Sequence, residues 1–278
     1  MHIFKNNLYT IVGLTGILLA VVAMVSCRGS STQTASSMPV TATPASPIEL
    51  TVCAGVGLTD VIKSINDLYM QENESVTIIA NFAAAGTLQQ QIEQGAPADV
   101  FFTPGVKQMD ALQNGGLIIN ETRRNLLNNK IVLVVPGNSN PGISSFMDLL
   151  KENISQIAIG DPESVPAGAY GKQALEQLGI YEQVQLKLIL CSDVRQVLGY
   201  VEAGNADAGI VYSTDAAITD NVKIAADAPD EVNSQIVYPV AVIKASQNVA
   251  AAKAYIAFLF SDEAKAIFEQ YGFVVVNK

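Results

Sequence analysis

Hydrophobic and polar positions along residues 48–278 follow two alternating periods. Short runs rich in apolar and β-branched residues are typical of buried strands, and they are separated by segments with apolar residues every three or four positions, typical of helices. In the segment 58–70 these apolar residues are Leu58, Val61, Ile62, Ile65 and Leu68. Strands that alternate with helices predict βαβ units and therefore an α/β fold with parallel sheets.

The predicted elements form two consecutive sets. The first set has strands at 48–53, 76–82 and 99–102 and helices at 58–70, 87–94 and 106–115. The second set follows the apolar run 130–135, with strands at 157–160, 184–190 and 208–211 and helices at 169–178 and 194–203. A β-rich run at 234–243 and a helical segment at 249–271 end the chain. Two such sets predict two lobes.

Residues 1–26 have the pattern of an export signal. Lys5 precedes a nearly continuous apolar run, and a small residue, Ser26, stands directly before Cys27. This pattern predicts a lipoprotein signal peptide, with Cys27 as the lipidated first residue of the mature chain. An uncleaved membrane anchor is the alternative, because the apolar run is nearly long enough to span a bilayer. Both interpretations place the remainder outside the cytoplasm.

Residues 27–47 are expected to form a tether rather than part of a domain. Ser, Thr and Pro make up 12 of the 20 residues that follow Cys27, so the segment has too few large apolar side chains to bury. The net charge of the whole chain is −10, and loss of residues 1–26 removes a single charged residue, Lys5. An acidic chain without a basic cluster argues against binding to nucleic acid.

The histidine and cysteine content excludes several kinds of chemistry. The one histidine, His2, lies in the predicted signal peptide, so the mature chain has no Ser-His-Asp triad and no His-ligated metal. Cys53 and Cys191 are far apart and lack metal-ligand spacing. Both lie in or beside apolar runs, so we expect buried free thiols, with a disulfide between them as the alternative.

The segment 160–172, GDPESVPAGAYGK, carries the strongest functional signal. It links a short predicted strand to a predicted helix through a turn rich in Pro and Gly. Such a turn collects backbone N–H groups at a helix N-terminus, where partial positive charge favours an anion. The segment therefore predicts an anion site that needs no basic side chain.

This segment resembles the GDPE-x-VPAG-x-Y-x-K motif of the molybdate/tungstate-binding proteins of ABC transporters. Further segments are similar to motifs of the same family: LTVCAGVGLTD at 50–60, NFAAAGTL at 81–88, QIEQGAPADVF at 91–101, DVRQ at 193–196, and VEAGNADAGIVYSTD at 201–215. The resemblance extends over essentially all of residues 48–276. It implies the two-lobed periplasmic-binding-protein type II fold, in which each lobe is a mostly parallel sheet flanked by helices and the chain crosses twice at the hinge. The implied lobes are 48–128 plus 236–278, and 129–235.

The resemblance also implies five positions around a tetrahedral oxyanion between the lobes: Gly57, Ala85, Ala167, Val194 and Tyr212. Ala167 and Val194 would donate backbone N–H groups, and Tyr212 would donate its phenolic hydroxyl. Gly57 and Ala85 replace two serines of the family, so two hydroxyl donors are missing. Thr59, Thr87 and Ser192 lie close in the sequence and are candidate replacements.

These features together predict a binding protein rather than an enzyme. We expect an extracytoplasmic, lipid-anchored and monomeric receptor that captures molybdate or tungstate, needs no cofactor or protein-bound metal, and delivers the anion to the permease and ATPase of an ABC transporter. A carrier or sensor of another oxyanion, such as sulfate, phosphate or a phosphonate, is the alternative. A hydrolase or transferase would need a Ser-Lys or two-carboxylate site, and no motif indicates either.

Overall fold

The computed structural model describes residues 47–138 and 142–276. Residues Ala45–Lys278 form one compact unit by themselves. The predicted signal peptide, Cys27 and the tether up to residue 46 lie outside the described residues. Within the described ranges, no helix has the length and apolar character needed to cross a membrane.

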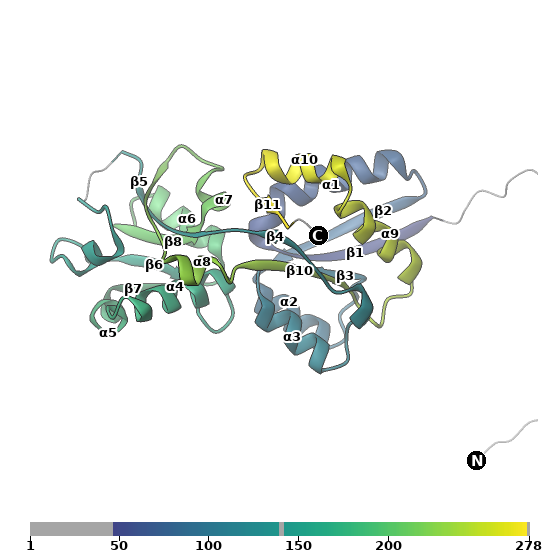
Figure 1. The fold of residues 1–278 in the computed structure, drawn as a ribbon, viewed down its shortest axis with the longest axis horizontal. Helices are drawn as coiled ribbons and strands as arrows, with labels where there is room; N and C mark the ends of the chain where they lie inside the picture. The colour runs from purple at the N-terminus through teal and green to yellow at the C-terminus, as the bar shows by residue number, and fades with distance from the viewer. Residues whose placement is uncertain (1–46, 139–141, 277–278) are drawn as a thin grey trace, which may run out of the picture. The chain divides into compact units, whose positions relative to one another are not determined.

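The first lobe is built on a mixed sheet (Figure 1). Its described strands, in spatial order, are β11 (Val274–Val275), β4 (Arg124–Asn128), β10 (Val237–Val242), β3 (Val100–Phe102), β1 (Ile48–Gly55) and β2 (Val76–Ala83). β1 pairs in parallel with β2, in a register that places Leu50 opposite Ile78, and it also pairs in parallel with β3. β10, on the chain that returns from the second lobe, runs antiparallel to both of its neighbours, β3 and β4.

Alternating side chains of the first sheet bury two separate apolar layers. Leu50, Val52 and Ala54 of β1 pack with the apolar face of α1 (Thr59–Glu72). Cys53 and Phe101 belong to the opposite layer, with apolar side chains of α2 (Ala85–Glu93) and α3 (Val106–Asn114). α9 (Val249–Leu259) and α10 (Asp262–Gln270) lie on the α1 side. The period of two along β1 thus produces a sheet covered by helices on both faces.

The second lobe has its own mixed sheet. Its described strands, in spatial order, are β7 (Leu188–Cys191), β6 (Ile157–Gly160), β8 (Ala208–Tyr212), β5 (Ile131–Pro136) and β9 (Val222–Asp227). β6 is parallel to β7 and β8, whereas β5 is antiparallel to β8 and β9. Two longer helices, α4 (Pro166–Gln177) and α6 (Val194–Glu202), pack on opposite faces of the sheet. Shorter helices are α5 (Tyr181–Val184), α7 (Ser213–Ala216) and α8 (Asp230–Asn233), and 3-10 turns cover Val56–Leu58, Asn120–Thr122, Phe146–Leu150 and Gln185–Lys187.

The chain passes between the sheets twice. It leaves the first sheet after β4 and enters the second at β5, and it returns between β9 and β10 (Figure 1). Asn129, at the first passage, is buried, and its Nδ2 donates to Thr214 Oγ1 at 2.8 Å and to Tyr238 Oη at 2.9 Å. The Asn129 side chain therefore links this passage of the chain to a strand of the first lobe and to a helix of the second lobe.

Several elements differ from the sequence-based expectation. The run 184–190 was expected to be a strand, but only Leu188–Cys191 pairs, because the preceding residues form α5 and a 3-10 turn. The expected helix at 249–271 is two helices, since the Ser261 hydroxyl accepts a hydrogen bond from Ala264 N and starts α10. Cys53 and Cys191 are buried free thiols, as expected, and each belongs to a different sheet.

Candidate anion-binding site

A small cavity of about 20 Å³ lies where segments of both lobes meet. All five positions expected from the sequence line it: Gly57, Ala85, Ala167, Val194 and Tyr212. The other lining residues are Gly55, Val56, Ala83, Ala84, Pro104, Val165, Pro166 and Asp193. The structure thus brings together residues as far apart in the chain as Gly57 and Tyr212.

The start of α4 supplies one wall of the cavity. Pro166 is the first residue of the helix, and Ala167 follows as the first residue with a backbone N–H. The N–H groups of a first helical turn have no partner within the helix, so they are free for a ligand. Gly168 lies against β6 so closely that a Cβ there would be 1.9 Å from the Gly160 carbonyl oxygen. The glycine is therefore needed to seat this helix on the strand.

The start of α6 supplies a second wall from the same lobe. Asp193 caps the helix, because its Oδ1 accepts a hydrogen bond from Gln196 N at 2.9 Å. Val194 is the first helical residue, and its side chain is buried. The cap fixes the direction of the helix, so the Val194 N–H belongs to a helix end that carries partial positive charge.

The first lobe contributes the opposite walls. Gly57 lies in the 3-10 turn that precedes α1, and Ala85 is the first residue of α2. Helix starts from both lobes therefore converge on one cavity. Because backbone dipoles favour negative charge at such ends, this arrangement suits an anion without a basic side chain in the lining.

Tyr212 provides a side-chain donor at the end of β8. Its hydroxyl is buried and has no hydrogen-bond partner among the described residues. A buried hydroxyl without a partner costs free energy, so the Tyr212 hydroxyl is a donor available to a group bound in the cavity. Burial raises the pKa of Tyr212 well above its usual value, and Tyr238, with its ring centroid 5.7 Å away, adds to this. The phenol therefore stays protonated and able to donate.

Two carboxyl groups lie in or directly behind the described lining of the cavity. Asp193 lines the cavity, and Asp215 lies behind Gly57, where a Cβ would be 3.2 Å from Asp215 Oδ1. Burial raises the pKa of Asp215 to about 6, although Arg195 lowers it. Among residues 47–138 and 142–276, no group of three or more His, Cys, Asp or Glu side chains could hold a metal ion.

The candidate replacements for the two missing hydroxyls do not line the cavity. Thr59 Oγ1 donates to Val56 O at 2.6 Å, and Thr87 and Ser192 are exposed. The idea that these side chains replace the serines is therefore wrong.

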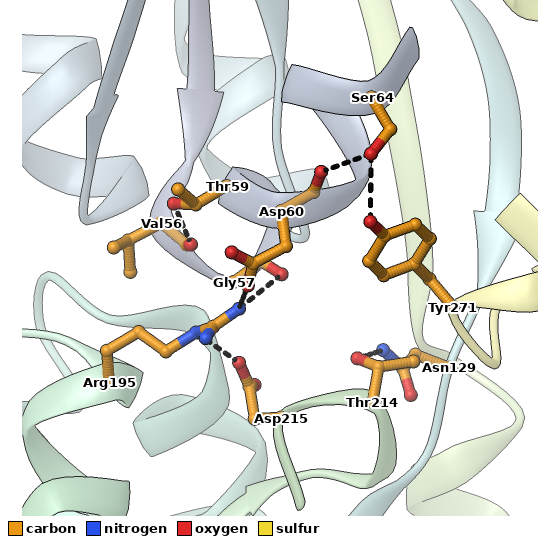
Figure 2. Close-up of polar contacts among 10 residues, drawn as sticks. All are labelled: Val56, Gly57, Thr59, Asp60, Ser64, Asn129, Arg195, Thr214, Asp215 and Tyr271. Atoms are coloured by element: carbon orange, nitrogen blue, oxygen red, sulfur yellow. Dashed lines mark hydrogen bonds and ion pairs between the residues drawn. The ribbon is translucent and has the colours of Figure 1, made fainter. Parts of the chain in front are cut away.

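The two lobes touch directly beside the cavity. Gly86 N donates to Ser164 O at 2.9 Å, which joins the start of α2 to the turn before α4. Figure 2 shows a second contact, in which Arg195 of the second lobe reaches Asp60 of the first at 2.8 Å. Neither contact was expected from the sequence, although Asp60 and Arg195 stand in two of the matching motifs.

Two sheets of this topology, two passages of the chain between them and a cavity at their boundary define a two-lobed periplasmic binding protein. The chain belongs to the family of bacterial extracellular solute-binding proteins, whose model matches residues 50–274.

Individual relatives make the family more specific. A putative ABC transporter substrate-binding lipoprotein of Bacillus subtilis, YvgL, is 39% identical over 97% of this chain and 98% of its own length. The molybdate-binding protein ModA of Escherichia coli is 37% identical over 82% of this chain and 89% of its own. The solved substrate-binding domain of a putative molybdenum ABC transporter from Clostridium difficile has a TM-score of 0.65 and 38% identity, over 83% of this chain and all of that one. The resemblance seen in the motifs is confirmed.

Proposed function

We propose that the protein captures molybdate or tungstate between its two lobes and delivers the anion to the permease and ATPase of an ABC transporter. The observation that carries the proposal is the cavity, where helix starts of both lobes meet the unpaired hydroxyl of Tyr212. A doubly charged tetrahedral oxyanion offers acceptors in all directions, which matches donors that converge from several sides. The names of the relatives point to the same ligand.

Capture requires that the ligand bind the closed arrangement better than the open one. Ala167, Val194 and Tyr212 belong to the second lobe, whereas Gly57 and Ala85 belong to the first. An anion that accepts hydrogen bonds from both groups gains its full set of contacts only when the lobes are together. Its binding energy therefore shifts the population towards the closed state.

The proposal places the protein outside the cytoplasm as a lipid-anchored monomer. The family is extracellular, and the Bacillus subtilis relative is named a lipoprotein. Cys27 would carry the lipid, and the Ser-, Thr- and Pro-rich segment after it would keep the binding unit near the membrane partner. Radiolabelled lipid incorporated by the full chain but not by a Cys27→Ala variant would test the anchor.

Thermal unfolding of the unit Ala45–Lys278 with added oxyanions tests the ligand. A ligand at 100 times its Kd adds about 2.7 kcal/mol to the free energy of unfolding. We expect molybdate and tungstate to raise the Tm, and sulfate, phosphate and a phosphonate to do so much less. If sulfate, phosphate or a phosphonate stabilised the unit more strongly, the proposed ligand would be wrong, but the proposal of an oxyanion carrier would stand.

A further inference from the structure

A cluster of charged and polar groups joins the lobes beside the cavity, and we call it the Arg195 cluster. Arg195 Nη2 lies 2.8 Å from Asp60 Oδ2 and 3.4 Å from Gly57 O, both in the first lobe. Arg195 Nε forms an ion pair of 3.0 Å with Asp215 Oδ1 in the second lobe, although not as a straight hydrogen bond. Figure 2 shows the guanidinium between these three partners.

Each member of the Arg195 cluster is tied to a cavity position through the backbone. Arg195 directly follows Val194, Asp215 stands three residues after Tyr212, and the Gly57 carbonyl belongs to a lining residue. Arg195 itself does not line the cavity. It lines a separate groove, together with Asp60 and Tyr271. The cluster thus forms part of the wall between the cavity and this outer groove.

The contacts of Arg195 differ in where their partners lie. The partner Asp215 is fully buried and belongs to the same lobe as Arg195, so this ion pair does not cross the lobe boundary. The contacts with Asp60 and Gly57 cross the lobe boundary, and they exist only while the lobes are together. A planar guanidinium suits this task because its fork of donors serves several acceptors at once.

We propose that Arg195 is a positioning residue that holds the lobes closed over the bound anion, through Asp60 and Gly57, and so slows release of the ligand. The inference rests on the proposed function of the cavity. It predicts an effect on dissociation, because the bridging contacts exist only while the lobes are together and must break before the ligand can leave.

A cation beside an anion site also attracts the anion at long range. A change at Asp60 distinguishes this attraction from the bridging of the lobes. If charge alone mattered, loss of the negative Asp60 side chain would strengthen anion binding. If Asp60 holds Arg195 across the boundary, the same loss weakens binding. Asp60 is also the safer position, since removal of Arg195 would leave Asp215 buried without its counter-ion and would threaten folding.

The test compares Asp60→Ala with Asp262→Ala in the unit Ala45–Lys278. Both residues are acidic and lie in the first turn of a helix of the first lobe, so the changes in charge and helix capping match. Among the described residues, Asp262 has no ion pair or hydrogen bond with the second lobe. Stopped-flow tyrosine fluorescence measures the molybdate association and dissociation rates, because Tyr212 lines the cavity and the chain has no Trp.

We expect Asp60→Ala to release molybdate about two- to fivefold faster with an unchanged association rate, as loss of a partly exposed ion pair implies. Asp262→Ala should change neither rate. Arg195→Lys keeps the charge but loses the fork of donors, so it too should release the anion faster. An unchanged or slower release from Asp60→Ala would overturn the inference.

A measurement on the ligand-free protein distinguishes failure of this inference from failure of the proposed function. A wild-type unit that binds no oxyanion in calorimetry would reject the function. Small-angle X-ray scattering of the ligand-free units then still judges the Arg195 cluster. We expect a larger radius of gyration for Asp60→Ala than for the wild type and Asp262→Ala. Equal radii for all three would contradict a closing role.

Discussion

Tyr212, in the cavity lining, and Tyr238, whose ring packs beside it, are both buried but differ in the state of their hydroxyl groups. The Tyr238 hydroxyl accepts a hydrogen bond from Asn129, whereas the Tyr212 hydroxyl has no partner among the described residues. Tyr212→Phe should therefore fold with little loss but bind molybdate about 1.5–3 kcal/mol more weakly, the value of a hydrogen bond to a charged group. Tyr238→Phe is the matched control, which should lower the free energy of unfolding and spare affinity. Calorimetry and urea unfolding of both variants provide the measurements.

The two positions that replace family serines should respond differently to restored hydroxyls. Gly57 has no positive φ, so a serine there brings no backbone strain. Its Cβ would lie 3.2 Å from Asp215 Oδ1, which places the new hydroxyl beside a competing acceptor. Ala85 already carries a Cβ at the cavity. Ala85→Ser should therefore tighten molybdate binding in calorimetry more than Gly57→Ser, and weaker binding by a well-folded Ala85→Ser would show that the space serves another purpose.

Asp215 should make anion binding depend on pH. Its raised pKa of about 6 means that it loses its proton near that pH in the free protein, with Arg195, Asp193 and Tyr212 facing it. A bound anion disfavours the charged carboxylate and raises this pKa further, so binding takes up protons. Affinity should then fall as the pH rises from 6 to 8, by up to tenfold for each unit of added shift.

Calorimetry in two buffers of different ionisation enthalpy measures this proton uptake. Asp215→Asn should abolish both the uptake and the change in affinity. A pH dependence that persisted in the variant would assign it to another group.

At the scale of elements, the approach of α2 to the turn before α4 limits how closely the lobes close. A Cβ at Gly86 would lie 2.8 Å from Ser164 O and 2.9 Å from Ser164 Cα, both in the other lobe. Alanine is the better helix former, so Gly86→Ala should keep or raise the free energy of unfolding. It should nevertheless weaken molybdate binding, because the methyl group meets backbone only in the closed arrangement.

Gly199→Ala is the control for this change. Gly199 lies inside α6, and no atom comes within 4 Å of a Cβ added there. It should stabilise the unit by about 0.5–1 kcal/mol and leave affinity unchanged. Equal affinities of the two alanine variants would show that the Gly86 contact plays no part in binding.

The elements also show how far local patterns predict structure. Strong apolar periodicity sufficed for α1 and β6, whose positions match the expectation closely. It failed at 184–190, where the apolar run Leu188, Ile189 and Leu190 forms an edge strand preceded by a helical turn. β9 was not expected, because its sequence mixes apolar and charged side chains, such as Val222, Lys223 and Asp227. Pairing with β5 gives this segment its strand conformation.

At the scale of the whole molecule, the candidate site depends on contacts that no local pattern contains. The five cavity positions were inferred from a family resemblance, and the fold brings them together from both lobes. The Arg195–Asp60 pair joins residues 135 positions apart, and the approach of Gly86 to Ser164 joins two separate turns. Such pairs depend on how the sheets meet, so sequence periodicity cannot predict them.

The charge of the molecule adds a further constraint. With a net charge of −10, the protein repels anions at long range, and the described lining of the cavity contains no Lys or Arg. Affinity should therefore come from local N–H dipoles and the Tyr212 hydroxyl, which salt screens weakly because the cavity excludes most solvent.

A calorimetric titration of the unit Ala45–Lys278 tests the central claim most directly. Molybdate, tungstate, sulfate and phosphate are titrated at low and at physiological ionic strength. We expect one molybdate or tungstate ion per chain, bound much more tightly than sulfate or phosphate, with an affinity that salt changes little. No binding of any of these anions, tighter binding of sulfate or phosphate, or an affinity that collapses at physiological ionic strength would contradict the account.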